Sequence, residues 1–142
     1  MTNNKRRKQK MAFYKKEKRE GKWHPRAVTK GRPYTTDDVA RRLSEMSTVS
    51  PGDTYAVLVN LGPVLAKMMS QGRSVQLKGV GTLYYTCQSV GKGVDTPEEV
   101  NPGQIGAVKV RFIPEYTRGN RGQVTERTLI DSDLEWIDAD EL

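Results

Sequence analysis

The chain has 142 residues, of which 24 are Lys or Arg and 17 are Asp or Glu, so its formal net charge is +7. Apolar residues make up 35% of the sequence; no run approaches the roughly 18 residues of a membrane span, and no apolar segment follows the basic N-terminus as in a secretory signal. A single cysteine and a single histidine exclude an intrachain disulfide and a Cys/His metal site.

The charge is divided unevenly along the chain. Residues 1–33 form a basic N-terminal extension with a net charge of +11, and residues 34–119 are close to neutral at +1. Residues 120–142 form an acidic C-terminal tail with a net charge of −5. We therefore divide the chain into a basic extension, one folded domain over residues 34–119 and an acidic tail.

The basic extension has the composition of a segment that binds an anionic polymer. The cluster from Lys5 to Lys8 suits phosphates, although a solvated chain end has the same composition. Further along, six Lys and Arg residues are interleaved with Phe13, Tyr14 and Trp23. These aromatic residues either stack on bases or pack on a core, and we favour packing. The sequence does not decide whether residues 11–33 are disordered or add a strand.

Two helices are predicted at the start of the folded domain. Residues 35–38, Thr-Thr-Asp-Asp, are typical of a helix start, and apolar residues then recur at helical spacing from Val39. This pattern predicts a helix over about residues 36–46. A second helix of about 20 residues is predicted from the cap Ser50 to Gly72, and apolar residues nearly surround it. No third helix follows to cover it, so we expect a second subunit to do so.

Three strands are predicted after the helices. Residues 74–77 and 82–89 alternate in polarity on either side of the turn Gly79-Val80-Gly81. Residues 93–107 are rich in Gly and Pro, and the third strand ends at Pro114. Alternation places Leu83, Tyr85 and Cys87 on one face of the second strand, and Val108, Val110 and Phe112 opposite Lys109 and Arg111 on the third.

The acidic tail mixes carboxylates with apolar residues. It holds Asp131, Asp133, Asp138 and Asp140 beside Leu134, Trp136 and Ile137. Such a segment is a docking element, an internal competitor for the basic extension, or a solvated tail, and we favour the solvated tail.

At this point the middle of the chain resembles the HU/IHF family of histone-like DNA-binding proteins. The resemblance lies in Gly72 to Leu83, where Gly79-Val80-Gly81-Thr82 joins two predicted strands, and in Phe112-Ile113-Pro114. It covers residues 34–116, and the whole is similar to an extended HU-like subfamily with an N-terminal extension.

The resemblance implies an α+β fold of the HU/IHF type. In it, two N-terminal helices are followed by a three-stranded antiparallel sheet with a β-arm, in an intertwined dimer. It also implies a bacterial, cytoplasmic protein of the nucleoid, a homodimer that binds double-stranded DNA without sequence specificity. In ordinary members the arms enter the minor groove, a proline at each tip wedges between base steps, and arm arginines hold phosphates.

The arm of this chain departs from that pattern. Residues 86–107 contain one base, Lys92, against Asp95, Glu98 and Glu99, and the usual arm-tip signature is absent. Phosphates repel an acidic arm, so we expect the basic extension to supply most of the contacts. The predicted DNA-binding residues are Lys15, Lys16, Lys18, Arg19, Lys22, Arg26, Lys92, Lys109, Arg111 and Arg118.

No motif predicts catalysis. The carboxylate pairs Asp37-Asp38 and Glu98-Glu99 stand at predicted helix starts, where capping is their usual role. Gly91-Lys92-Gly93 is no phosphate-binding loop, and His24 has no recognisable nucleophile. We expect no enzyme activity, cofactor, metal, small-molecule substrate or membrane association. The alternative to a DNA-binding protein is a scaffold dimer that keeps the HU fold without DNA bending, and RNA binding is a third option.

Overall fold

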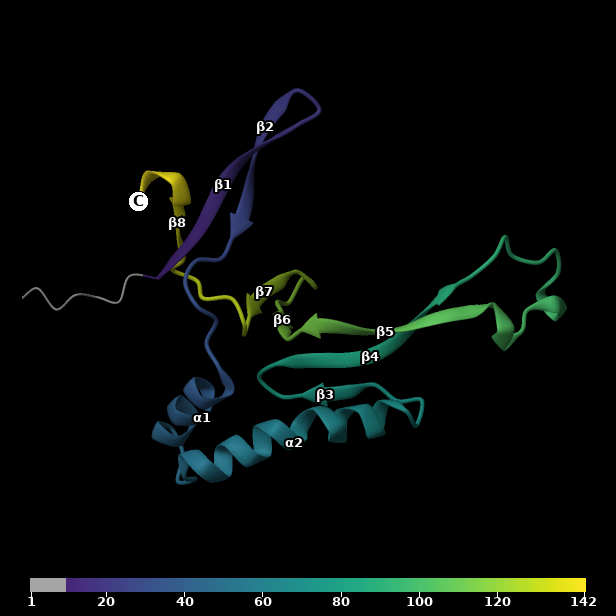
Figure 1. Cartoon of the computed structure of the whole chain (residues 1–142), viewed down its shortest axis with the longest axis horizontal. Helices are drawn as coiled ribbons and strands as arrows, with labels where there is room; N and C mark the ends of the chain where they lie inside the picture. The colour runs from purple at the N-terminus through teal and green to yellow at the C-terminus, as the bar shows by residue number, and fades with distance from the viewer. Residues whose placement is uncertain (1–9) are drawn as a thin grey trace, which may run out of the picture. The chain divides into compact units, whose positions relative to one another are not determined.

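The computed structural model describes residues 10–142, so the predicted cluster Lys5–Lys8 lies outside the described residues. Within these bounds the chain forms two α-helices and eight strands in three sheets (Figure 1). The chain divides into two compact units, which are described separately. The first unit joins the described residues up to Pro33 to Ile130–Leu142, and the second is Tyr34–Leu129.

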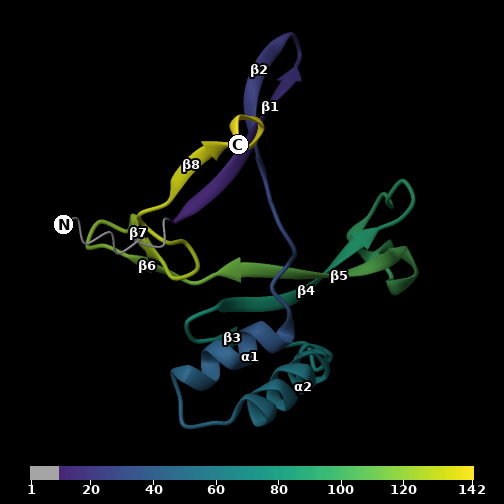
Figure 2. The same cartoon turned by 60° about the vertical axis from the view of Figure 1, so that its left-hand side comes forward.

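The first unit is a three-stranded sheet in the order β2-β1-β8. Strands β1 (Met11–Arg19) and β2 (Lys22–Val28) form an antiparallel hairpin, and β8 (Glu135–Asp138) lies parallel to β1 (Figure 2). The β1–β8 register runs only from Met11 to Tyr14, so the rest of the hairpin extends beyond β8. Residues 11–28 therefore add strands, and β8 shows that the acidic tail is not simply solvated.

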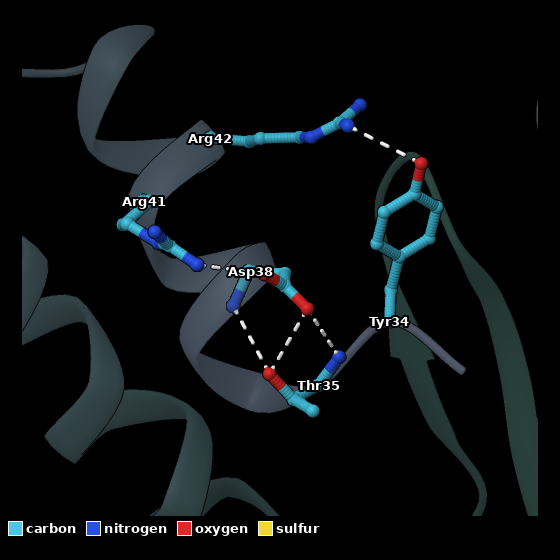
Figure 3. Close-up of polar contacts among 5 residues, drawn as sticks. All are labelled: Tyr34, Thr35, Asp38, Arg41 and Arg42. Carbon is cyan, nitrogen blue, oxygen red and sulfur yellow. Dashed lines mark hydrogen bonds and ion pairs between the residues drawn. The ribbon is translucent and has the colours of Figure 1, made fainter. Parts of the chain in front are cut away.

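The second unit begins with helices α1 (Thr36–Glu45) and α2 (Pro51–Met69), close to their predicted bounds. Figure 3 shows why α1 starts at Thr36. The Thr35 hydroxyl accepts the Asp38 N–H at 3.4 Å, and the Asp38 carboxylate accepts the Thr35 N–H at 2.8 Å. Arg41 donates to the same carboxylate at 2.7 Å. These bonds hold the pKa of Asp38 below its usual range, and the bond from the Thr35 N–H has the largest effect.

The three predicted strands form one antiparallel sheet in the order β3-β4-β5. They are β3 (Val75–Leu77), β4 (Gly81–Ser89) and β5 (Ile105–Pro114). Register pairs Tyr85 with Val110, and the Tyr85 hydroxyl donates to the Ala66 carbonyl of α2 at 3.3 Å, so the apolar face looks toward that helix. The connection between β4 and β5 contains short 3-10 helices at Pro97–Glu99 and Pro102–Gln104 (Figure 1).

A hairpin that the sequence did not predict follows β5. Strands β6 (Tyr116–Arg118) and β7 (Val124–Arg127) pair antiparallel as a third sheet. Glu115 anchors this hairpin to the β3–β4 turn, because its carboxylate accepts the Gly79 N–H at 3.0 Å and the Thr128 hydroxyl at 2.5 Å. These two bonds lower the pKa of Glu115, and the bond from the Thr128 hydroxyl has the larger effect.

The predicted fold class is wrong for this chain. The prediction of two helices followed by a three-stranded sheet with a β-arm describes only part of a β-rich arrangement. One hairpin, β1–β2, precedes the helices. After the three-stranded sheet, β6 pairs with β7, and β8 pairs with β1. The physical reason is that β1 and β2 carry too many cations for their alternation to show. In addition, the partner of β1 on its other side comes from the opposite end of the chain.

Little apolar surface is buried within the described chain. The buried apolar residues are Ala40 and Met69 in the second unit and Ala139 in the first. Many large apolar side chains of α2 remain exposed, among them Val57 at 66%. An isolated domain must cover the apolar faces of its helices, and the second unit does not do so. Its buried core is therefore too small for a domain of its length.

Replacing Gly81 by Ala is expected to destabilise the second unit. Gly81 has a φ of +153°, and a Cβ there would meet the Ile113 carbonyl and lie 2.7 Å from the Phe112 ring. Overpacking of this kind costs about 1–3 kcal/mol. Thermal unfolding followed by circular dichroism should show a lower Tm. Gly52→Ala in α2 is the control, because a Cβ there meets nothing within 4 Å and its Tm should hold or rise. Equal Tm values for the parent and Gly81→Ala would contradict the expectation.

Candidate nucleic-acid interface

The hairpin β1–β2 is closed by a turn of two residues. Glu20 has a φ of 49° and Gly21 a φ of 79°, and positive φ at both positions is what a type I′ turn requires. This turn suits the twist of the two strands and fixes their register, which pairs Arg19 with Lys22 and Lys18 with Trp23. The hairpin is therefore a regular two-stranded ribbon.

The register divides the hairpin side chains between two faces. Residues directly opposite one another on antiparallel strands share a face, and successive residues alternate. We name the two sets after their distinctive residues. The arginine face consists of Lys15, Glu17, Arg19, Lys22, His24 and Arg26, and the tryptophan face consists of Tyr14, Lys16, Lys18, Trp23 and Pro25.

The arginine face carries one anion among its cations. The Glu17 carboxylate lies 3.6 Å from Arg19 Nε and 3.8 Å from Arg26 Nε. Both guanidinium groups remain largely exposed, and one carboxylate cannot neutralise two cations. Near the base of the hairpin, the Lys30 ammonium lies 5.5 Å from the centre of the Phe13 ring.

The acidic tail forms ion pairs with the lysines at the base of the hairpin, which is the end away from the turn, where β1 pairs with β8. Asp131 accepts from Lys10 at 2.7 Å, Asp138 lies 3.3 Å from Lys16, and Asp140 lies 3.8 Å from Lys15. The hydrogen bond to Asp131 raises the pKa of Lys10, and that to Asp138 raises the pKa of Lys16. These acids are plain in the sequence, but only the pairing of β8 with β1 brings them to the lysines.

Positive charge remains exposed on the rest of the hairpin, where Glu17 and the turn residue Glu20 lie among the cations and Arg26 lies opposite Lys15 in the register. Within residues 10–142, Lys18 and Lys22 form no ion pair, and Arg19 and Arg26 share the single carboxylate of Glu17. All four side chains are exposed. Of the six predicted residues in the hairpin, the structure thus separates Lys15 and Lys16, which are paired with the tail, from these four.

The other four predicted residues lie in the second unit. Lys109 pairs in register with Thr86 and Arg111 with Tyr84, on the sheet face opposite the apolar one. Lys92 is exposed in the connection between β4 and β5. Arg118 is engaged within its own hairpin, since it donates to the Gly122 carbonyl at 2.7 Å and to the Tyr116 hydroxyl at 3.2 Å. The predicted set is therefore distributed over both units.

Sequence reasoning missed the cations around β6 and β7. Arg121 and Arg127 were assigned to the acidic tail, although Arg127 ends β7 and Arg121 lies in the β6–β7 turn. The available signal was the turn Gly119–Gly122 between two short segments that hold the strand-forming residues Tyr116, Thr117, Val124 and Thr125.

Neither a metal cluster nor a membrane-spanning helix occurs in the described part of the chain. Among residues 10–142, no three His, Cys, Asp or Glu side chains are placed to hold a metal ion. None of the helices there has the length and apolarity needed to cross a membrane.

Comparisons with known proteins match this chain to a family of HU domains and to solved structures. A family model described as an HU domain fused to a wHTH, Ig or glycine-rich motif matches residues 4–126. A solved structure from Bacteroides vulgatus ATCC 8482, described as a "putative bacterial DNA binding protein", is 11% identical with a TM-score of 0.57. The match covers 92% of this chain and 48% of that one, so this chain spans about half of its neighbour's length. No curated protein matches the sequence.

Acidification is expected to release β8 from β1. Lys10 holds the pKa of Asp131 low, and the Asp140 N–H, followed by Lys16, holds the pKa of Asp138 low. Each carboxylate therefore contributes stability that is complete above the ordinary aspartate pKa of about 3.9. That stability is lost as the pH falls through the lowered folded value.

Fluorescence of Trp136 on β8, recorded against pH in a Trp23→Phe variant, should change below about pH 4. Asp131→Asn combined with Asp138→Asn should lose most of this pH step, because those side chains no longer titrate. An unchanged Trp136 signal down to about pH 2, well below the ordinary aspartate pKa, would contradict the assignment.

Proposed function

This chain belongs to the HU-HIG family of HU domains, and we propose that it is a DNA-binding protein that contacts phosphates mainly through its N-terminal hairpin. The binding is independent of sequence, because Lys and Arg contacts to phosphates carry no base information. The site of action is the bacterial nucleoid, where a family of architectural DNA-binding proteins would work. The fold of the solved neighbour, described as DNA-binding, is consistent with this proposal.

The exposed cations of the hairpin that the tail leaves unpaired carry this proposal. Four exposed bases lie within nine residues of chain, from Lys18 to Arg26, on both faces of a two-stranded ribbon. A ribbon of this kind fits the major groove of duplex DNA, where cations on its two faces reach phosphates on both strands. Each phosphate neutralised releases a counterion, which drives binding without sequence readout.

The connection between β4 and β5 contributes little to this binding. Around Lys92 it carries Asp95, Glu98 and Glu99, and its prolines Pro97 and Pro102 start short 3-10 helices. The acidic side chains repel phosphates, so we do not assign proline wedging to this segment. Lys109 and Arg111 on β5 are auxiliary contacts in the proposal.

We also propose that the protein acts as a homodimer. The second unit exposes apolar side chains along α1 and α2, and only Ala40 and Met69 among its apolar residues are buried. A second copy covering these faces would remove them from water, at about 25 cal/mol per Å². A dimer would also present two basic hairpins to one DNA molecule, which multiplies affinity.

Charge removal at the distal hairpin is expected to weaken DNA binding. The test is fluorescence anisotropy of a labelled 30-base-pair duplex at several salt concentrations, with Lys18, Lys22 and Arg26 changed to Gln. We expect affinity to fall about 10- to 100-fold and the salt dependence to become shallower by about 0.9 for each phosphate that the variant no longer neutralises. The matched control changes Lys67, Arg73 and Lys78 to Gln, which removes the same charge elsewhere and should have a small effect.

An equal fall in affinity for the two variants would show that net charge, and not the hairpin, drives binding. No binding of the parent at low salt would overturn DNA binding and favour the alternative, a scaffold dimer. The exposed apolar residues around Val100 and Val108 in the second unit would then be the first surface to examine for a protein partner.

Light scattering at micromolar concentration is expected to give about 32 kDa, twice the chain mass of 16.0 kDa. Changing the exposed Val57 of α2 to Lys should shift the population toward the monomer, because a charge would have to be buried in the interface. Gln71→Lys, outside both helices, is the control and should leave the mass unchanged. A parent mass equal to the single-chain value of 16.0 kDa would overturn the homodimer.

A further inference from the structure

Trp23 is an exposed aromatic residue near the tip of a basic hairpin. Its side chain is 68% exposed, and no hydrogen bond or cation–π contact involves that side chain within residues 10–142. An indole is a large apolar surface that a folded chain normally covers. The expectation that the aromatic residues of this segment pack on a core therefore fails for Trp23 within this chain.

The residues around Trp23 are cations and rigid backbone. Lys18 lies directly opposite Trp23 in the register and on the same face, whereas Lys22, the preceding residue on β2, lies on the arginine face. Neither forms an ion pair in the described residues, so both ammonium groups are available to a ligand. Pro25 follows on the same face, on the outer strand of the sheet, where a missing N–H costs no ladder bond. The type I′ turn and this proline restrict the backbone on either side of Trp23.

An indole with an unpaired cation on its own face and another at the neighbouring position matches the chemistry of an unstacked nucleotide. A base stacks on the aromatic face while the adjoining phosphates meet the ammonium groups, a combination that binds single strands with little sequence preference. In an intact duplex the faces of the bases are covered by their neighbours, and the grooves show only base edges. The indole can therefore stack only where a base has left the helix.

We propose that Trp23 is a base-stacking residue, which gives the hairpin a preference for nucleic acid with unpaired bases over intact duplex. This inference rests on the proposed function, since the same hairpin cations hold the phosphates. It adds a base contact to what would otherwise be a purely electrostatic site. The acidic segment leaves this site open, because β8 pairs only with Met11–Tyr14 at the other end of β1.

The test uses the full chain with Trp136 changed to Phe, so that Trp23 is the one remaining tryptophan. Three probes are titrated at one salt concentration: an intact 30-base-pair duplex, the same duplex with a gap of six thymidines, and a single strand of twelve thymidines. We expect Trp23 emission to be quenched by the gapped duplex and the single strand and to change little with the intact duplex. The single strand should be tested as DNA and as RNA, to separate the two sources of unpaired bases.

Trp23→Ala should weaken binding to the gapped duplex and the single strand about tenfold, in line with stacking on one base, and leave intact-duplex binding nearly unchanged. Trp23→Phe should restore part of the affinity, because a smaller ring still stacks. Trp136→Ala, at the other exposed tryptophan of the unit, is the matched control and should not alter the preference.

The remaining outcomes would each overturn the inference. Equal affinity of the parent for all three probes, or an equal weakening by Trp23→Ala for all three, would reject base stacking while leaving phosphate binding intact. A blue-shifted Trp23 emission that no probe changes would show that protein covers the indole. Absence of binding to every probe would reject the proposed function as well, and so differs from the first two results.

Discussion

The pairing of β8 with the first residues of β1 is the interaction on which the charge pattern of this protein depends. It is a short parallel pairing between segments more than 120 residues apart, and it places Asp131, Asp138 and Asp140 beside Lys10, Lys16 and Lys15. The pairs Lys10–Asp131 and Lys15–Asp140 are exposed and each adds little stability by itself, whereas the carboxylate of Asp138 is buried. Their larger effect is to decide which cations of the hairpin are neutralised and which stay free.

The hairpin carries ion-paired lysines at its base and unpaired lysines nearer its turn. Lys15 and Lys16 form ion pairs with carboxylates of the tail, whereas Lys18 and Lys22 lie beyond the part of β1 that pairs with β8. Trp23 is exposed in the same part of the hairpin, opposite Lys18. Within residues 10–142 the tail pairs with Lys16 on that face and leaves Lys18 without an ion pair.

Much of the second unit could be predicted from local signals. The capping residues before Thr36 and Pro51 and the glycine turn at Gly79–Gly81 mark element ends by backbone chemistry, which needs no knowledge of distant residues. The faces of β4 and β5 followed from alternation, and in the structure Leu83, Tyr85 and Cys87 lie opposite Phe112, Val110 and Val108. The resemblance to the HU/IHF family rested on these same residues, and the family match confirms it at the level of an HU-like domain.

The elements that overturned the predicted fold class depend on partners far away in the sequence. Alternation in β1 is hidden because Lys and Arg occupy both faces, so neither face reads as apolar. Strand β8 has four residues and is recognisable only once Met11–Tyr14 is known to be a strand. The same limitation applies to the candidate site, whose ten predicted cations could be read from composition. The division between neutralised and free cations depends on where each carboxylate lies in space.

Each unit exposes surface that a partner would cover, and a dimer bound to DNA would cover both. The second unit exposes apolar helix faces that another copy of the chain can cover, while its acidic connection between β4 and β5 repels phosphates. The first unit has the opposite character, with free cations and an uncovered indole at the tip of a rigid ribbon. In the function that we propose for this HU-family chain, the hairpin supplies the DNA contact that an acidic arm would repel, and dimerisation through the helical unit brings two hairpins together.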